Sequence, residues 1–294
     1  MKKLGLSVGG GGFMGIGVAQ FLVLLQVWLD GSLASLLAWA AGTSVGSIVV
    51  ALLAVGYTPL EILALFRQHL PGIFGKVNLR WRLFKQGPRY DDTYVVNLLK
   101  EKLGNRTMDQ TLFPLFLTSW DARKRDLKVF GPSDTTVPIW YAVRCSMAAP
   151  TYFGSPDRRC EDGGMGANDP TLVGLAGIVQ MRKVMGTDDI RLLNLVTSGA
   201  TPEGGPIDSC PFLWTTLLDD VLPALTVGNS SAIAYIVNAW IMTLEDLGGK
   251  MQMVRINPLT PDFQLDAVDH AEDVVQIWAK TWIEHGDAVK ILVG

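Results

Sequence analysis

Two short apolar runs near the start of the chain each end in a glycine-rich turn, and a further apolar segment follows each turn. The first turn, residues 9–15, reads GGGGFMG, and the second, residues 42–46, reads GTSVG. Glycine permits the tight turns that join a buried strand directly to a helix. Strand, glycine turn and helix in repeated order predict an α/β unit built on a parallel sheet.

Strand-like and helix-like segments alternate along almost the whole chain. Thr58-Pro59-Leu60-Glu61 is a capping box, which predicts a helix start there. Strands are expected at residues 4–8, 33–40, 115–120, 127–130 and 190–196. Helices are expected at residues 15–28, 45–55, 58–69, 91–103, 136–147, 172–185, 231–247 and 271–285, the last one capped by Asp269. We therefore predict an α/β fold with a mostly parallel sheet, in a single domain over residues 1–294.

The N-terminal part is apolar enough to raise the question of a membrane. Hydrophobic residues make up 49% of the chain and charged residues 18%, and Asp30 is the only charged residue between residues 4 and 60. Residues 31–60 could span a bilayer, but the turn at 42–46 interrupts them, so a buried strand and helix are the better interpretation. Lys2 and Lys3 resemble the start of a secretory signal, although the glycine run that follows would break its apolar helix. We expect a cytoplasmic or peripheral membrane protein, with a secreted effector left open.

Charge and cysteine content exclude other classes. A net charge of −3 gives no support for a nucleic-acid partner. The three cysteines, Cys145, Cys160 and Cys210, and the three widely separated histidines lack the spacing of a metal site. We expect reduced, mostly buried thiols and neither a metal nor a cofactor.

The turn at residues 42–46 has the pattern Gly-x-Ser-x-Gly, with Gly42 and Gly46 flanking Ser44. This pattern places a serine on a strained strand-to-helix turn, at a helix N-terminus whose free amides favour negative charge. Ser47 lies one turn further on and lacks the flanking glycines. Ser44 is therefore the candidate nucleophile.

The earlier glycine loop carries the candidate donors for an oxyanion. Backbone amides of Gly10, Gly11, Gly12 and Gly15 could point at the oxygen of a tetrahedral intermediate. The same loop also satisfies the dinucleotide fingerprint Gly-x-Gly-x-x-Gly, with Asp30 near the distance of a ribose ligand. Asp30 precedes the second predicted strand, whereas the fingerprint requires its acid at the end of that strand. A dinucleotide-binding protein is therefore the weaker alternative.

The base that would accept the serine proton is the remaining question. Asp162 stands before Gly163 and Gly164, which let the backbone pass close to another element. A carboxylate can accept a serine proton directly when it is within hydrogen-bonding reach and its basicity is raised by partial burial. His270 or His285 could complete a Ser-Asp-His triad instead, but both lie in polar settings at the predicted C-terminal helix.

At these motifs the chain resembles the patatin-like phospholipases. That family carries a Gly-Gly-Gly-x-x-Gly loop, Gly-x-Ser-x-Gly and Asp-Gly-Gly, which match here at residues 10–15, 42–46 and 162–164. The segment Arg144-Cys145-Ser146-Met147-Ala148-Ala149-Pro150 and the later Asn168-Asp169-Pro170 also have counterparts in the family. The resemblance covers residues 4–194, and residues 201–294 match poorly.

The resemblance implies a three-layer α/β/α fold and a dyad of Ser44 and Asp162 that needs no histidine. It also implies cleavage of acyl esters from phospholipids, lysophospholipids, galactolipids or neutral lipids. Phe13 and Met14 replace the basic residue often found in the loop, which weakens any claim of a phosphate contact. A catalytically silent binding or storage protein of the same fold remains an alternative, and a protein or small-molecule activator stays open.

Residues 75–92 form a candidate lid or membrane-contact segment. Basic residues alternate there with large apolar ones, and the candidate membrane contacts are Arg80, Trp81, Arg82, Phe84 and Lys85. Cations would meet anionic headgroups while the aromatic rings enter the interface. A solvated loop with a few aromatic anchors is the simpler interpretation of the same residues.

Overall fold

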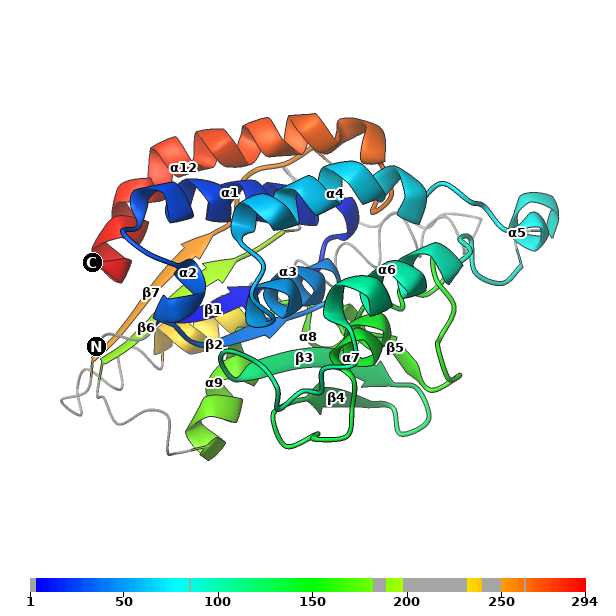
Figure 1. Ribbon diagram of the computed structural model, residues 1–294, viewed down its shortest axis with the longest axis horizontal. Helices are drawn as coiled ribbons and strands as arrows, with labels where there is room; N and C mark the ends of the chain where they lie inside the picture. The colour runs from blue at the N-terminus through cyan, green and yellow to red at the C-terminus, as the bar shows by residue number, and fades with distance from the viewer. Residues whose placement is uncertain (1–3, 85, 182–188, 198–231, 240–249, 262) are drawn as a thin grey trace.

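The computed structural model describes residues 4–84, 86–181, 189–197, 232–239, 250–261 and 263–294. Its centre is a seven-stranded sheet with the order β4-β3-β2-β1-β6-β7, while β5 pairs with β3 off this path (Figure 1). The strands are β1 (Leu4–Val8), β2 (Leu37–Gly42), β3 (Leu115–Asp121), β4 (Asp126–Phe130), β5 (Cys160–Asp162), β6 (Asp189–Leu195) and β7 (Lys250–Ile256). The pairs among β3, β2, β1, β6 and β7 are parallel, and β4 and β5 run antiparallel to β3.

Helices cover both faces of the sheet (Figure 1). On one face an apolar core joins the sheet to α1 (Gly15–Trp28), α3 (Val45–Ala54), α4 (Pro59–Ile73), α6 (Thr93–Leu103), α7 (Ile139–Ser146) and α12 (Ala271–Val293). On the other face a second core joins it to α9 (Thr171–Met181) and a helix over 232–239. Short elements complete the described parts: η1 (Gly12–Met14), α2 (Leu33–Leu36), α5 (Leu79–Phe84), α8 (Gly164–Ala167) and η3 (Val268–His270). The fold is therefore a three-layer α/β/α sandwich.

Small residues on the second face make room for one large side chain. Trp39 of β2 is 1% exposed and lies against Gly5 of β1 and Gly174 of α9. A Cβ atom on Gly5 would lie 2.4 Å from the indole, and one on Gly174 would lie 2.1 Å from it. A side chain at either glycine would therefore displace Trp39 from the layer between sheet and helix.

Burial accounts for the apolar N-terminal third. Every residue of β1 and β2 is buried, because helices cover both faces of these central strands. Nine of the residues of α3 are buried as well. Within the described parts of the chain, no helix is both long and apolar enough to cross a bilayer.

The predicted elements are present, with several changed boundaries. Residues 33–36 form helix α2 instead of the start of a strand, because Leu33 N–H donates to Gln26 Oε1 and a first turn forms there. Helix α7 begins at Ile139, later than predicted, since Pro138 occupies its N-cap. The last helix is capped at His270 rather than Asp269 and continues to Val293.

The capping box at Thr58 and Glu61 is confirmed, and its helix extends to Ile73. The predicted helices at 172–185 and 231–247 are confirmed where the structure describes them, and their remaining residues lie outside the described part.

Candidate active site

Ser44 occupies a strained turn between β2 and α3. Its backbone has φ 52° and ψ −124°, a conformation that non-glycine residues seldom adopt. Gly46 follows in the first turn of α3, where a Cβ atom would lie 2.2 Å from the carbonyl oxygen of Val8. The backbones of β1 and α3 therefore approach so closely that only glycine fits at this position. The half-buried Ser44 side chain lies at the N-terminus of a ten-residue helix.

The register of the sheet brings Asp162 to Ser44. Gly42, the last residue of β2, pairs with Leu117 of β3, and Asp162 pairs with Ser119 two residues further along the same strand. Strand β5 therefore fills the position beside β3 that β2 leaves at its end. The result is a hydrogen bond of 2.7 Å from Ser44 Oγ to Asp162 Oδ2. Gly164 N–H donates to the other carboxylate oxygen, Oδ1, at 2.7 Å.

Burial makes the Asp162 carboxylate more basic than usual. Loss of solvent around its 7% exposed side chain raises the pKa of Asp162 to about 6, against the lowering effects of the Ser44 and Gly164 hydrogen bonds and the charge of Arg144. Arg144 is itself buried on α7 and donates to Asp92 Oδ2 at 2.6 Å. At neutral pH the carboxylate is thus ionised and still a better proton acceptor than a solvated aspartate.

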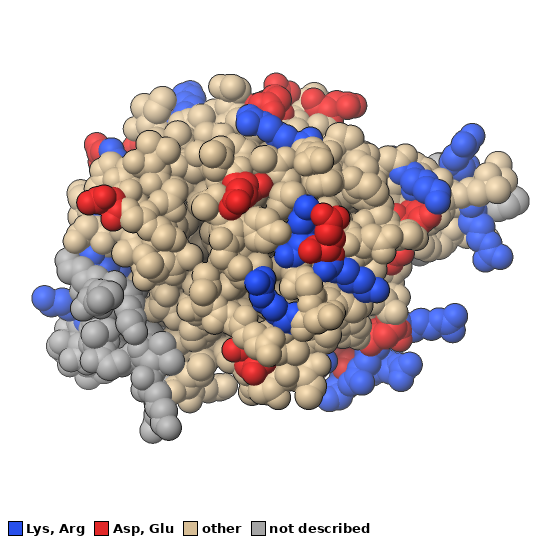
Figure 2. All heavy atoms as spheres, in the orientation of Figure 1, with Lys and Arg blue, Asp and Glu red and all other residues tan. Residues whose placement is uncertain are grey.

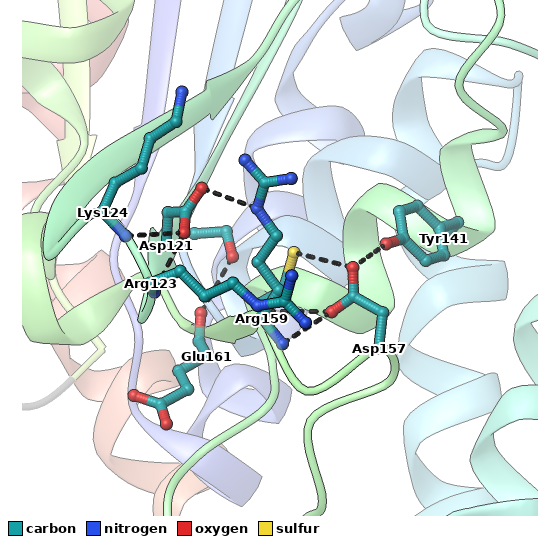
Figure 3. Close-up of polar contacts among 9 residues, drawn as sticks. Asp121, Arg123, Lys124, Tyr141, Asp157, Arg159 and Glu161 are labelled. Atoms are coloured by element: carbon teal, nitrogen blue, oxygen red, sulfur yellow. Dashed lines mark hydrogen bonds and ion pairs between the residues drawn. The ribbon is translucent and has the colours of Figure 1, made fainter.

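The segment before Asp162 is fixed by polar contacts on both sides (Figure 3). The Asp157 carboxylate accepts a hydrogen bond from the Tyr141 hydroxyl at 2.8 Å and from the backbone amides of Arg159 and Cys160 at 3.0 Å each. The Arg159 Nε atom donates to Asp121 Oδ2 at 2.8 Å, across to the end of β3. These contacts hold the short strand β5 in the register that places Asp162 beside Ser44. Cys145 and Cys160 are buried free thiols, and Cys210 lies outside the described residues.

The glycine loop lies directly beside Ser44, and two of its backbone amides donate no hydrogen bond to a described residue. Gly10 N–H donates to Asn168 O at 3.1 Å, Phe13 N–H donates to Leu265 O at 2.9 Å, and Gly15 N–H donates to Gly12 O and Phe13 O. The amides of Gly11 and Gly12 donate no hydrogen bond to any described residue.

Of the four predicted oxyanion donors, Gly10 and Gly15 thus have amides that bond within the protein, whereas those of Gly11 and Gly12 bond to no described residue. Gly10 is required for close approach, because a Cβ atom there would lie 3.1 Å from Ser44 Cβ and 2.6 Å from Asn168 Oδ1. Gly15 is required for packing, because its Cβ atom would lie 2.3 Å from Val45. Gly163 lies close to the backbone of β3, because a Cβ atom added to it would be 2.5 Å from Thr118 O.

The sequence did not predict the contacts of several residues that support the site. Ser146 Oγ accepts the Ser44 backbone N–H at 2.9 Å. Asp169, which is 1% exposed, accepts hydrogen bonds from the side chains of Thr171, Asn194 and Arg255 and so holds the segment whose Asn168 contacts Gly10. The Asn-x-Pro motif and the Ser146 segment were visible in the sequence, but neither motif alone indicates which atoms it contacts.

An apolar pocket opens beside Ser44. It contains about 480 Å³ of space between atoms, part of it open to solvent, and α3, α4, the segment after α7 and Leu265 provide its walls. Its lining residues are Gly12, Ser44, Val45, Ile48, Phe66, Leu70, Ile73, Phe74, Met147, Ala149, Tyr152, Phe153 and Leu265. A second, mostly apolar space of about 430 Å³, part of it open to solvent, lies between α3, α4 and α6. Its lining includes His69 and Lys102 and shares Ile48, Phe66 and Ile73 with the first.

The histidine and dinucleotide alternatives find no support in the geometry. His270 Nδ1 contacts Asp273 at 2.8 Å and its ring stacks on Phe263, while His285 is exposed on α12. Asp30 is exposed at the far end of α1 from Gly15, and a fourteen-residue helix is about 20 Å long. Ser44 Oγ already donates to Asp162, so the observed pair is a serine and an aspartate.

Known proteins resemble this chain. Residues 6–175 match the family model described as patatin-like phospholipase. A patatin-like protein 2 of Oryza sativa subsp. indica is 30% identical over 212 residues, which cover 59% of this chain and 52% of that protein. An intracellular phospholipase A2 of Caenorhabditis elegans is 26% identical over 180 residues, which cover 57% of this chain and 16% of that protein. The crystal structure of VipD from Legionella pneumophila matches with a TM-score of 0.46 and 15% identity, over 97% of this chain and 67% of that one.

The chain belongs to the patatin-like phospholipase family. The resemblance seen in the motifs is therefore confirmed, as is the α/β/α fold class. The chain spans about half the length of the plant relatives that it matches. Strands β6 and β7 and helix α12 lie beyond the residues that match the family model.

Proposed function

We propose that this protein is a lipid acyl hydrolase that uses Ser44 as nucleophile and Asp162 as general base. The observation that carries the proposal is the hydrogen bond of 2.7 Å from Ser44 Oγ to a buried carboxylate of raised pKa. Ser44 lies beside the glycine loop, whose Gly11 and Gly12 amides bond to no described residue, and it lines an apolar pocket. Nucleophile, base, oxyanion donors and a place for an acyl chain thus meet in one site.

The reaction would proceed through an acyl-enzyme. Ser44 Oγ attacks the ester carbonyl carbon as its proton passes to Asp162, and the Gly11 and Gly12 amides donate to the oxyanion. Asp162 then gives the proton to the leaving alcohol. In the second half, Asp162 accepts a proton from water as the water oxygen attacks the acyl-enzyme carbonyl. Asp162 then returns this proton to Ser44 Oγ as the bond to the acyl group breaks and the fatty acid leaves. The strained Ser44 backbone keeps the hydroxyl in position through both halves.

The pocket supports an ester with an apolar acyl chain. Its lining has no charged side chain, and we infer that a long acyl chain passes Ile48 and Phe66 into the adjoining space, whose lining is apolar apart from His69 and Lys102. Burial of each further methylene of a chain contributes about 0.8 kcal/mol. Medium and long acyl chains should therefore be preferred over acetyl esters. The substrate class is therefore a lipid ester, and the test uses a soluble ester and a phospholipid.

The first test compares the wild-type protein with Ser44→Ala. Ester hydrolysis is measured with a medium-chain p-nitrophenyl ester and with a fluorogenic phospholipid in liposomes. We expect activity in the wild type and a loss of about 10⁴-fold or more in the variant, since the nucleophile is removed. Ser47→Ala is the matched control, because Ser47 Oγ only donates to Ser44 O in the first turn of α3.

A fluorophosphonate probe separates the remaining outcomes. Labelling of wild type but not of Ser44→Ala, together with hydrolysis, supports the proposal. A folded wild type that is neither labelled nor active on either ester would contradict it and favour a silent binding or storage protein. Labelling without lipid hydrolysis would indicate a competent site that requires an activator.

A second prediction concerns the apolar path. Ile48 belongs to the lining of both spaces, so Ile48→Trp should block the inner one while leaving the carbonyl position free. The ratio of kcat/KM for a dodecanoyl ester to that for a butanoyl ester is expected to fall about tenfold or more, because inner methylenes lose their burial. Ile283→Trp, on the exposed side of α12, is the control for an added indole. An unchanged ratio would place the acyl chain elsewhere.

A further inference from the structure

Residues 75–84 and 86–90 belong to an arm that leaves the body of the protein and returns to it, with α5 at its end (Figure 1). Val77 and Tyr90 form an antiparallel bridge at its base, and Asn78 N–H donates to Arg89 O at 2.8 Å. Asn78 Nδ2 also donates to Pro88 O at 3.0 Å. The two sides of the arm are therefore tied to each other, and α5 is held out from the surface.

The end of the arm exposes apolar and cationic side chains together. Leu79 and Leu83 are 66% and 62% exposed, and residues four apart lie on the same side of a helix. Arg80 and Arg82 are exposed as well, and neither forms an ion pair with a described residue. Figure 2 shows basic side chains at the outermost part of this projection.

The charge of this region has one sign. The sequence contains no aspartate or glutamate between residues 62 and 90, although five basic residues lie between 76 and 89. The two basic residues at the base of the arm are neutralised locally: Lys76 pairs with Asp91 at 2.7 Å, and Arg89 pairs with Asp266 at 2.8 Å. The unpaired positive charge of the described arm thus lies at its outer end.

The base of the arm is continuous with the wall of the active-site pocket. Arg89 N–H donates to Thr151 O at 2.7 Å, and Tyr90 N–H donates to Tyr152 O at 2.9 Å. Tyr152 lines the pocket beside Ser44, as does Leu265, the neighbour of the Asp266 that pairs with Arg89. The arm therefore starts beside the pocket, and any surface on which the arm docks would lie near the pocket as well.

We propose that this arm docks the protein on an anionic lipid surface. Leu79 and Leu83 enter the interface while Arg80 and Arg82 contact acidic headgroups, the combination by which short amphipathic helices bind membranes. The inference rests on the proposed function for its purpose, delivery of a lipid ester to Ser44, but the docking itself requires no hydrolysis. Of the residues predicted from the sequence, Arg80 and Arg82 keep this role, Trp81 is half-buried, and the side chains of Phe84 and Lys85 lie outside the described part.

A lipid surface fits this helix better than a protein partner does. An interface supplies an apolar layer and a layer of negative charge within a few ångströms, so it accommodates leucines and arginines on one projecting helix without a matching shape. An acidic protein would have to provide both features in a groove of the right form. Failure of the protein to bind vesicles in the experiment below would favour such an acidic protein instead.

Binding is measured by sedimentation with phosphatidylcholine vesicles, with and without phosphatidylserine, in the Ser44→Ala background so that no lipid is consumed. We expect binding to the anionic vesicles that weakens with added salt. Arg80→Gln/Arg82→Gln should weaken the partition coefficient about 10- to 30-fold, because each basic residue near the surface contributes about 1 kcal/mol. Leu79→Ser/Leu83→Ser should weaken binding about tenfold or more.

The matched control is Arg106→Gln/Lys250→Gln, which makes the same change of charge at two exposed residues away from the arm. It should bind as the parent does. Equal binding by the arginine variant and the parent would overturn the proposal, as would a parent that binds neither vesicle, which would leave an acidic protein as the occupant. A loss with the arginine variant but not with the leucine variant would overturn the insertion of the leucines.

Activity gives an independent readout with Ser44 intact. The arm variants should hydrolyse a soluble p-nitrophenyl ester at the wild-type rate and lose activity on anionic liposomes in parallel with binding. If the proposed function were wrong, the wild type would hydrolyse neither ester, while the vesicle experiment would still decide whether the arm docks. The two failures are thus distinguishable.

Discussion

Asp162→Asn is expected to lower kcat/KM for ester hydrolysis by about 10²–10⁴, because the general base is removed while the hydroxyl of Ser44 remains. Asparagine has nearly the shape of aspartate, and its Oδ1 atom can still accept the Gly164 N–H, whereas its Nδ2 group stands in place of the oxygen that accepts the Ser44 hydroxyl and cannot take the proton. The variant therefore removes proton acceptance with little change of packing. Rates are measured with the soluble ester, so that binding to lipid surfaces does not contribute.

The pH dependence of the wild type should report the same group. The pKa of Asp162 is raised to about 6 by burial, so kcat/KM should fall about tenfold per pH unit below that value as the carboxylate becomes protonated. The fall should be absent in Asp162→Asn. A profile governed instead by a group that must be deprotonated near pH 7, and that is lost on His270→Ala or His285→Ala, would contradict the assignment and favour a histidine-containing triad.

Stability separates loss of chemistry from loss of fold. The native pKa of Asp162 lies above that of an unfolded aspartate, so between about pH 4 and 6 the native state binds more protons than the unfolded state. This carboxylate therefore destabilises the fold increasingly as pH rises through that window, by an amount of about 2–3 kcal/mol at pH 7. Asp162→Asn should unfold at the same or a higher denaturant concentration than the wild type at pH 7.

A neighbouring acid provides the control. Glu161 is the preceding residue of β5, and successive side chains of a strand point to opposite faces. Figure 3 shows its carboxylate away from the other polar contacts, whereas its carbonyl oxygen accepts the Ser119 hydroxyl at 2.9 Å. Glu161→Gln should retain wild-type activity and pH dependence. If it lost as much activity as Asp162→Asn, the effect would belong to the strand and not to the base.

The sequence predicted the parts of this site whose signals are local. The Gly-x-Ser-x-Gly motif at residues 42–46 predicts a sharp turn from these five residues alone. The structure gives the reason: the Ser44 backbone is strained, and a Cβ atom at Gly46 would collide with β1. The apolar runs around it likewise indicate a buried strand and helix. The capping box at Thr58 works in the same way, because its two partners lie three residues apart.

The remaining parts depend on contacts between distant segments. That Asp162 meets Ser44 follows from where β2 and β5 pair along β3, a register that no local pattern records. The pattern likewise does not record the partners of the loop amides: those of Gly10 and Gly15 bond within the protein, and those of Gly11 and Gly12 bond to no described residue. Leu265 and Arg255 come from the part of the chain that matches the family poorly, and only the three-dimensional structure shows that they support the site.

Gly12→Ala should reduce kcat/KM about 10²–10³-fold, the effect of losing an oxyanion donor. Gly12 has φ +58°, and a Cβ atom there would lie 2.2 Å from Leu265 O and 2.8 Å from Leu265 Cα. Because both atoms belong to the backbone, the new methyl group has to move the loop, and the Gly11 and Gly12 amides would move with it. Labelling of Ser44 by the fluorophosphonate should slow in parallel, since it forms a similar oxyanion.

Gly104→Ala isolates the effect of the contact from the effect of the backbone. Gly104 follows α6 with φ +62°, almost the value of Gly12, and an added Cβ atom meets nothing within 4 Å. Both variants should lose about 1–3 kcal/mol of stability, because a positive φ is unfavourable for alanine, and Gly12→Ala should lose more because of its contact with Leu265. Only Gly12→Ala should lose activity. If Gly12→Ala and Gly104→Ala were equally active, the oxyanion would be stabilised by other donors, and the glycine loop would serve only to let β1, α1 and Ser44 approach one another.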